Sequence, residues 1–474
     1  MQKPFFLKDL ARQCGIIVLL LVLSLAPRPI LGYLDLKHAR ALVAGNPDYR
    51  DLADSYASAA ERLPWEPSLY EEAANAYLKA GDFAGAEEFY RLGLQHGTLS
   101  PDSWMGWEQA VAAQGDLPAA IAIWEQALDR KGLSPYLHWD LARAYQAVGN
   151  YPGAIRQWQA FLAAYPGDGL AHYQLGLLLA ATDPENALPE LMQASRLEAS
   201  LDPTVQGLRS ALNASLLSGG RADHFVVAGR SLAALGDWDL AGEAFRNATV
   251  ANAGDAEAWA WLAETRQQLG QDGKIEIEKA LALNPDLAIV QSMYGLYLQR
   301  QDRPAAALRA FQIAASLDPG NAAWQLALAG GFEQTGNLVA ALDHYQQAVL
   351  LAPDDPSAWR ALAQFSLRKG VDLAGTGLPA ALRLMELSNS DWQSFDIAGQ
   401  LLMETGDPVG AEDLLKRALA LDPTRAAPAL HLGLLYLQTG NRAGAYSYLN
   451  QARIFDPSGP DGWQAGRLLD QYFP

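Results

Sequence analysis

The stretch 336–359, "GNLVAALDHYQQAVLLAPDDPSAW", contains one copy of a pattern that returns along most of the chain. The same pattern appears at 406–427, "GDPVGAEDLLKRALALDPTRAA", and at 149–170, "GNYPGAIRQWQAFLAAYPGDGL". In each copy a glycine comes first, small and large apolar residues follow at spacings of three and four, and a proline comes near the end. Because this spacing places apolar side chains on one side of a helix, the stretch predicts a repeated helical unit.

The glycines set the length of the repeat at 34 residues. That separation holds within four groups: Gly81, Gly115 and Gly149; Gly236 and Gly270; Gly336 and Gly370; Gly406 and Gly440. Two acidic residues hold the same register, since Asp183 lies 34 residues after Gly149 and Asp302 lies 34 before Gly336. A chain of 474 residues is too long for one compact core, so it forms either two ordinary domains or a repeat array. The sustained period predicts the array.

Each recurring position has a physical role in the predicted unit. Glycine tolerates a positive φ and so closes the first helix. After Gly336, the small side chains of Ala341 and Ala348 let the second helix approach closely, and Tyr345 fills the remaining gap. Pro353 ends the second helix because it lacks an N–H group. The unit is therefore predicted to be a helical hairpin with one apolar face for its own partner helix and one for the next repeat.

These residues resemble the tetratricopeptide repeat, a degenerate 34-residue helix–turn–helix, over residues 67–457. The resemblance implies an all-α fold, an α-α superhelix that forms a right-handed solenoid of about 11 hairpins. It also implies a concave groove, lined by the first helices, that holds a protein or peptide partner.

Departures from the period divide the predicted array into segments. These are a short basic tail at 1–13, a transmembrane or signal-anchor segment at 14–34, a degenerate first repeat at 35–66, a first block of repeats at 67–202, an irregular joint helix at 203–223, a second block at 224–457 and a capping helix at 458–474. The joint is expected because the 53 residues from Asp183 to Gly236 exceed one period by 19. An insertion at 371–379 is either functional or a tolerated loop, and the sequence leaves its role open.

The N-terminal segment is typical of both secretory signals and signal anchors. Lys3, Lys8 and Arg12 precede an uncharged apolar run, Cys14–Ala26. Thirteen residues are too few to span a bilayer, but the apolar character resumes, so the run extended to residue 34 is long enough. The basic flank favours a single-pass membrane protein with its N-terminus cytoplasmic and its repeats extracytoplasmic. A cleaved signal, and so a secreted protein, is the alternative.

Composition excludes several classes of function. Outside the first 35 residues the chain has 31 basic and 51 acidic residues, a net charge of −20, which disfavours binding to nucleic-acid phosphates. Cys14 is the only cysteine, so neither an internal disulfide nor a thiolate metal site is expected. No two of the seven histidines have metal-ligand spacing, and no glycine-rich phosphate loop follows a strand. The sequence therefore predicts a non-enzymatic protein with no cofactor, no metal and no small-molecule ligand.

The predicted groove supplies candidate partner-binding residues. They are Asn75, Gln109, Arg143, Tyr173, Arg360, Gln364 and Arg368. The last three form a polar, basic strip, and any of the seven could instead be only solvated or packed between neighbours. Some tetratricopeptide domains hold a peptide's terminal carboxylate in a basic clamp. Here only Asn75 and Arg143 suit anion capture at the corresponding positions of the first repeats, and Glu71 would repel an anion, so no such clamp is expected.

The function predicted from these observations is a membrane-anchored scaffold that binds a protein or peptide partner in its concave groove, on the non-cytoplasmic side. A glycan-binding or envelope-polysaccharide assembly component is the alternative, and it requires rows of exposed tryptophan or tyrosine along the groove. Most of the 13 tryptophans instead occupy positions that face the partner helix and are expected in the core. The identity of the partner, the pathway and the oligomeric state do not follow from the sequence.

Overall fold

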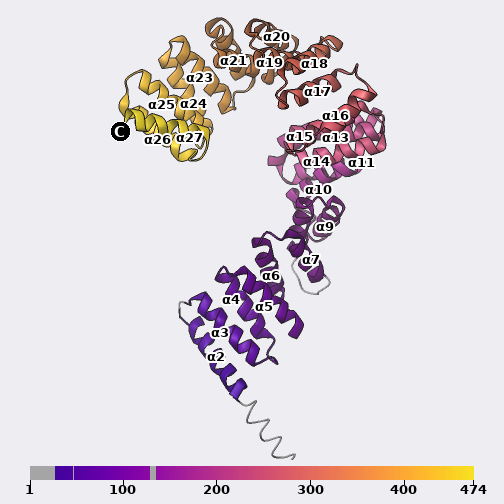
Figure 1. Ribbon diagram of the computed structural model, residues 1–474, viewed down its shortest axis with the longest axis vertical. Helices are drawn as coiled ribbons and strands as arrows, with labels where there is room; N and C mark the ends of the chain where they lie inside the picture. Colours follow the sequence, from indigo (N-terminus) through magenta and orange to yellow (C-terminus); the bar gives the residue numbers. More distant parts are fainter. Residues whose placement is uncertain (1–26, 46, 129–134) are drawn as a thin grey trace, which may run out of the picture. The chain divides into compact units, whose positions relative to one another are not determined.

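The computed structural model describes residues 27–45, 47–128 and 135–474. Within them the chain forms 26 α-helices, one 3-10 turn and one short π-helix, and it forms no strand (Figure 1). The all-α fold predicted from the repeat is therefore confirmed. Contacts divide the chain into two units, Met1–Leu217 and Ser218–Pro474. The division falls inside the segment predicted to be an irregular joint.

Unit 1 contains five successive helical hairpins followed by one additional helix in its described residues. Its elements are α2 (Pro27–Val43), α3 (Tyr49–Arg62), α4 (Ser68–Lys79), α5 (Phe83–His96), α6 (Pro101–Ala113), α7 (Leu117–Leu128), α8 (Tyr136–Ala147), α9 (Tyr151–Ala164), α10 (Gly169–Thr182), α11 (Pro184–Leu197), the 3-10 turn η1 (Ala199–Leu201) and α12 (Asp202–Ser218).

Unit 2 contains seven further hairpins and a terminal helix. Its elements are α13 (Arg221–Ala234), α14 (Trp238–Ala251), α15 (Ala256–Gln268), α16 (Lys274–Leu283), α17 (Ala288–Arg300), α18 (Pro304–Leu317), α19 (Ala322–Gln334), α20 (Leu338–Leu351), α21 (Pro356–Lys369), the π-helix η2 (Leu373–Gly377), α22 (Leu378–Leu387), α23 (Trp392–Thr405), α24 (Pro408–Leu421), α25 (Ala426–Gln438), α26 (Arg442–Phe455) and α27 (Pro460–Tyr472).

Helix α2 is where the predicted membrane segment meets the described residues. The basic tail and most of the segment predicted at 14–34 lie outside the described residues. The end of that segment belongs to α2, which continues through Asp35, Lys37 and Arg40 and buries Leu36 and Ala39. No helix within the described ranges is long and apolar enough to cross a membrane. Of the segment predicted at 14–34, α2 contains only residues 27–34.

A glycine in the left-handed region closes the first helix of nine hairpins, as the sequence predicts. Their φ angles lie between 65° and 89°, with Gly336 at 80°. Asp302 takes the same role with φ of 54°. Asp183 differs, because its φ is −153° and it alone separates α10 from α11. The 34-residue register therefore continues through Asp183, but the left-handed turn does not.

The residue after the turn glycine caps the second helix. In seven hairpins it is Asp or Asn, and its side chain accepts a hydrogen bond from the backbone N–H three residues later, as Asn337 does from Ala340 at 3.2 Å. Such a cap satisfies an N–H group that has no partner inside the helix. Gln271 and Val371 follow the other two glycines. These are the two irregular hairpins, in which α16 and α22 are only 10 residues long.

The buried alanines let neighbouring hairpins nest, as predicted. Ala341, Tyr345 and Ala348 are all buried in the interior of the α19–α20 hairpin. Leu362 of the next first helix belongs to the same cluster as Ala341 and Tyr345, so the core is continuous from one hairpin to the next. Helix α27, in the segment predicted to be a cap, buries Leu469 against the last hairpin.

Candidate partner-binding site

The first helices of unit 2, α13, α15, α17, α19, α21, α23 and α25, form what we call the first-helix face. Ion pairs join several neighbouring helices of this face. Glu264 of α15 accepts two hydrogen bonds from the guanidinium of Arg300 on α17, both at 2.6 Å, and a third from Gln268 at 2.8 Å. The carboxylate is buried, at 4% exposure, so this pairing is screened little by solvent.

Similar pairs continue toward the C-terminus and involve the predicted basic strip. Arg368 of α21 pairs with Glu333 of α19 at 3.1 Å. Arg360 of α21 pairs with Asp391, the N-cap of α23, at 2.7 Å. Both predicted arginines therefore already have carboxylate partners within the fold. The strip is polar, and each of its two arginines is paired, although Glu333 also pairs with Lys369 at 3.6 Å.

A hollow of about 260 Å³ lies between α21 and α23 on the first-helix face. We call it the groove hollow. Helix α21 supplies one stripe of its lining and α23 the other, at the three- and four-residue spacing of a helix face. The lining residues are Gln364, Leu367, Arg368, Gln393, Asp396, Ile397 and Gln400. Two predicted residues, Gln364 and Arg368, thus meet in one site, and Arg360 lies one turn before Gln364 on the same helix.

Hydrogen bonds fix the position of Asp396 in the wall of the groove hollow. Asp396 is buried and accepts a hydrogen bond from Gln400 at 2.9 Å, while its other oxygen lies 2.7 Å from Nδ1 of His431 on α25. Burial alone lowers the pKa of His431, but the charge and hydrogen bond of Asp396 outweigh it, and the pKa is raised. Protonated His431 therefore stabilises the position of Asp396 in the wall of the hollow.

The groove hollow combines amide groups with an apolar surface. Three glutamines offer both donors and acceptors, and Leu367 and Ile397 supply the apolar part. Side-chain amides of this kind can bind the backbone of an extended peptide whatever its sequence, while an apolar side chain enters between them. The arrangement contains no nucleophile–base pair, and no group of metal-ligating side chains occurs in the described part of the chain.

The four predicted residues of unit 1 lie on four separate first helices. Asn75 of α4 accepts a hydrogen bond from the hydroxyl of Tyr90 at 2.5 Å, so it packs inside its own hairpin. Gln109 of α6 and Arg143 of α8 are exposed, and Tyr173 of α10 is half-buried. None of them lines the groove hollow. They remain predictions.

Two carboxyl groups beside these residues have altered acidity. Burial, together with the nearby charge of Asp140, raises the pKa of Glu108 on α6 to about 7. Burial also raises the pKa of Asp140 on α8, and the charge of Arg143 opposes that rise. A partly buried carboxyl group therefore lies next to Gln109 on α6, and another lies near Arg143 on α8. The absence of an anion-binding clamp stays a prediction.

Gln393, Asp396 and Gln400 complete the groove hollow but were not among the predicted residues. Asp396 and Gln400 lie 10 and 6 residues before Gly406, the offsets at which Arg360 and Gln364 precede Gly370. The signal was therefore present in the register of the glycines. It was obscured because the insertion at 371–379 lengthens this period to 36 residues.

Two family profiles match the chain, and both describe the tetratricopeptide repeat. One matches residues 298–365 and 402–468, and the other matches 139–200 and 226–271. Together they cover just over half of the chain. No curated protein sequence matches it.

Solved structures of helical-repeat proteins are similar to the chain at low identity. The Cut9–Hcn1 hetero-tetramer of the APC/C is 14% identical, with a TM-score of 0.47, and the match covers 96% of this chain and 98% of that one. Yeast Tom70 is 16% identical, with a TM-score of 0.41, and 94% and 95% are covered. YrrB, described as a protein with an unusual peptide-binding site, is 20% identical, with a TM-score of 0.33, and 40% and 97% are covered.

Proposed function

Because the chain belongs to the tetratricopeptide repeat family, whose members serve as scaffolds for protein–protein interaction, we propose that unit 2 binds an extended segment of a partner protein in the groove hollow. The observation that carries this proposal is the meeting of three glutamines and two apolar residues in one hollow between α21 and α23. In this proposal the protein acts as a scaffold, and the lining of the groove hollow supplies groups for binding.

The mode of binding follows from the charges on the first-helix face. Arg360 and Arg368 are already paired, so a partner gains little from net charge there. Hydrogen bonds from Gln364 and Gln400 to the partner's backbone orient the segment, and an apolar side chain packs against Leu367. Binding in the groove hollow therefore depends on shape and backbone hydrogen bonds, and it changes little with salt.

A peptide-selection experiment tests this proposal. Random 12-residue peptides displayed on phage are selected for binding to the full chain. The dissociation constants of the selected peptides are then measured by fluorescence anisotropy. The variants Gln364→Ala and Gln400→Ala should weaken binding about tenfold, the loss expected for hydrogen bonds that a buried backbone then lacks. The matched control is Gln347→Ala, an exposed glutamine of α20 outside the groove hollow. Equal affinity for all three variants would show that peptides bind elsewhere.

We also propose, from the order of basic and apolar residues before residue 34, that the N-terminal segment anchors the repeats to a membrane and leaves them on its non-cytoplasmic side. Cell fractionation with alkaline carbonate extraction tests the anchor, and a reporter fused to the C-terminus tests the side. Recovery of the whole protein in the carbonate-soluble fraction contradicts the anchor. A mature chain that begins near residue 27 supports cleavage and secretion instead.

The glycan alternative lacks a supporting observation. It predicts rows of exposed tryptophan or tyrosine along the groove. Among the described residues the exposed tryptophans are Trp65, between α3 and α4, and Trp463, on α27. The exposed tyrosines are Tyr33, Tyr49, Tyr136, Tyr165, Tyr446 and Tyr472. None of these residues lies on a helix of the first-helix face. Trp104 is buried, as the sequence predicts, and Trp359 is half-buried with its indole N–H donating to Pro353 at 2.8 Å.

A further inference from the structure

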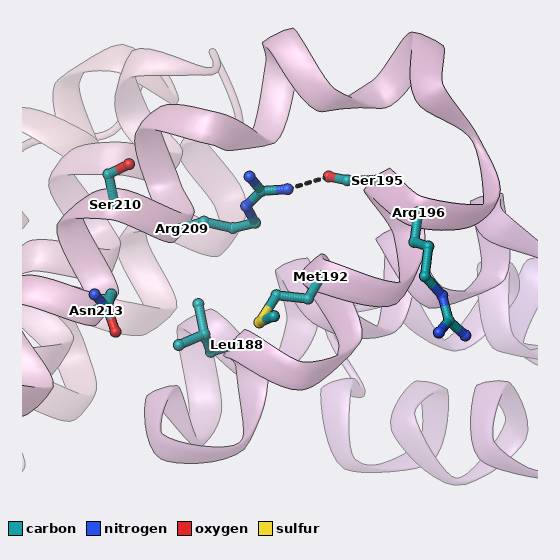
Figure 2. Close-up of a pocket in the computed structure, with 7 residues that line it drawn as sticks. All are labelled: Leu188, Met192, Ser195, Arg196, Arg209, Ser210 and Asn213. Atoms are coloured by element: carbon teal, nitrogen blue, oxygen red, sulfur yellow. Dashed lines mark hydrogen bonds between the residues drawn. The ribbon is translucent and has the colours of Figure 1, made fainter.

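The additional helix α12 interrupts the alternation of first and second helices at the end of unit 1. It follows α11 after the single turn η1, where a regular array would begin another hairpin. Between α11 and α12 lies a hollow of about 560 Å³ (Figure 2). We call it the α11–α12 hollow. Its volume is in the range of cavities that hold ligands, and it is larger than the groove hollow.

Two arginines and no carboxylate line the α11–α12 hollow. Its lining residues are Leu188, Met192, Ser195 and Arg196 from α11 and Arg209, Ser210 and Asn213 from α12. The chain as a whole has a net charge of −18. Asp202, outside the lining, pairs with Arg209 at 2.7 Å and balances its charge, so Arg196 supplies the unbalanced positive charge of the lining. A hollow that keeps a positive charge in an acidic chain, beside hydroxyl and amide groups, favours an anionic ligand.

Arg209 is held in place with part of its binding capacity unused. In Figure 2 it reaches across the hollow toward Ser195, and its Nη1 donates to the Ser195 hydroxyl and, at 2.7 Å, to Asp202. Within the described part of the chain, Nη2 and Nε of Arg209 have no hydrogen-bond partner. A guanidinium has five N–H donors in a fixed plane, so one that is already oriented can still bind a carboxylate at two points.

The remaining lining residues indicate what accompanies the acidic group. Met192 is 57% exposed and lies beside Leu188, so the two form an apolar patch next to Arg209 (Figure 2). Arg196 is also exposed, points away from Arg209, and forms no ion pair with the described residues. Arg196 therefore supplies a second positive charge at the rim, but it does not bind the acidic group that Arg209 binds.

We propose that the α11–α12 hollow is a second binding site, separate from the groove hollow, for an acidic segment of a partner protein. The carboxylate of an Asp or Glu binds Arg209, and a bulky apolar residue beside it packs on Leu188 and Met192. A nucleic acid or a phosphate alone leaves the apolar patch unfilled, and the net charge of −18 on the whole chain repels a polyanion. A peptide with one acidic side chain beside an apolar one can bind Arg209 and cover the apolar patch at the same time.

The test uses the full chain and an array of fluorescein-labelled ten-residue peptides. Each peptide carries one adjacent pair of an acidic residue, Asp or Glu, and an apolar residue, Leu, Ile, Phe or Met, and each has a counterpart with Asn or Gln in place of the acid. Anisotropy should show binding of acidic–apolar peptides that is about tenfold weaker for their amide counterparts and for Arg209→Gln. The variant Gln364→Ala should leave this binding unchanged, which separates it from the groove hollow.

Two further variants show whether weaker binding comes from loss of the binding surface or from loss of folding. Met192→Ser alters a residue that is 57% exposed, so it should leave the fold intact, and it should weaken binding of the same peptides several-fold. Met105→Ser, an exposed methionine on α6, is its matched control and should change nothing. Affinity that is unaffected by both Arg209→Gln and Met192→Ser overturns the proposal. So does a result in which vesicles containing phosphatidylglycerol or inorganic phosphate bind in an Arg209-dependent manner and no acidic–apolar peptide does.

Discussion

Glu264 and Arg300 face each other across neighbouring first helices, with two nitrogen–oxygen distances of 2.6 Å. The carboxylate is buried on α15 and the guanidinium lies on α17, 36 positions later in the sequence. Hydrogen bonding to Glu264 raises the pKa of Arg300, so the guanidinium stays charged. It connects two hairpins through their polar side as well as through their alanine-bearing faces.

Removal of one partner should therefore destabilise unit 2 strongly. Arg300→Met leaves the carboxylate of Glu264 buried without its counter-charge, and we expect a loss of about 3 kcal/mol in the free energy of unfolding. Urea denaturation followed by circular dichroism measures it. Lys416→Met, which removes an exposed pair with Glu412, is the control and should cost less than about 0.5 kcal/mol. Equal losses would mean that burial adds nothing to the Glu264–Arg300 pair.

A substitution at the left-handed turn of Gly336 should also lower the free energy of unfolding, by a smaller amount. Gly336→Ala places a Cβ where φ is 80°, which disfavours any L side chain, and we expect a loss of about 1 kcal/mol. The surrounding space is open, so no clash contributes. Gly320→Ala is the matched control, because this glycine also lies in open space but without a positive φ. A loss at Gly320 as large as at Gly336 would contradict the backbone explanation.

The hairpins could be predicted from the sequence because the information that specifies them is local. Gly336, Ala341 and Pro353 each act on their own turn or helix, so their spacing is enough. The caps were missed, although the dipeptides of Gly with Asp or Asn were visible at seven turns. Their absence after Gly270 and Gly370 marks the two hairpins with short second helices.

The state of the candidate site could not be predicted in the same way. The sequence places Arg360 in a polar, basic strip and leaves open whether it packs against neighbours; in the structure it pairs with Asp391, which lies 31 positions later on the next hairpin. Such a pairing depends on the distance and rotation between successive hairpins, which the period alone does not fix. The α11–α12 hollow could not be predicted for a similar reason. The residue count from Asp183 to Gly236 predicts an extra helix, but the packing of that helix determines how much space remains beside it.

Glu108 should make unit 1 less stable as the pH rises through neutrality. Burial raises its pKa in the folded state from 4.5 to about 7, so the folded chain holds the proton more tightly than the unfolded chain does. The stability that this proton contributes is present at pH 4.5 and is lost as the pH approaches 7 and above. Glu108→Gln should therefore raise stability at pH 8 by about 1–2 kcal/mol, after allowance for solvent screening.

Thermal unfolding at pH 5 and pH 8 measures the effect of Glu108. The midpoint of Glu108→Gln should vary less between the two conditions than that of the unsubstituted chain. Glu88→Gln removes an exposed carboxylate from α5 and serves as the control. If both substitutions change the pH dependence equally, the effect comes from net charge and not from the buried position.

His431 should give unit 2 a pH dependence that reports on the groove hollow. The Asp396–His431 pair raises the pKa of His431 in the folded state, so its stabilisation is complete below about 6.5 and disappears as the pH rises through the raised value. Asp461 on α27 acts in the same direction, and burial raises its own pKa. His431→Gln should shrink the fall in unfolding midpoint between pH 6 and pH 8, and so should Asp396→Asn.

An NMR titration of the ring protons of His431 supplies an independent measurement. We expect a midpoint above that of an exposed histidine in the intact chain and a lower one in Asp396→Asn. A midpoint that does not move in this variant would mean that Asp396 does not hold the imidazolium.

Extensive contacts in the described chain join helices that are adjacent or next but one in the sequence, such as α23 with α24 and α25. Loop closure over such short separations costs little entropy, so any hairpin can serve as a starting point for folding. The same locality limits cooperativity, because the loss of one hairpin removes only the contacts on its two sides. Under force or in denaturant the molecule should therefore come apart in several steps, beginning at its ends. Each step will have its own midpoint, so the effect of a substitution is measured on the transition of the unit that contains it.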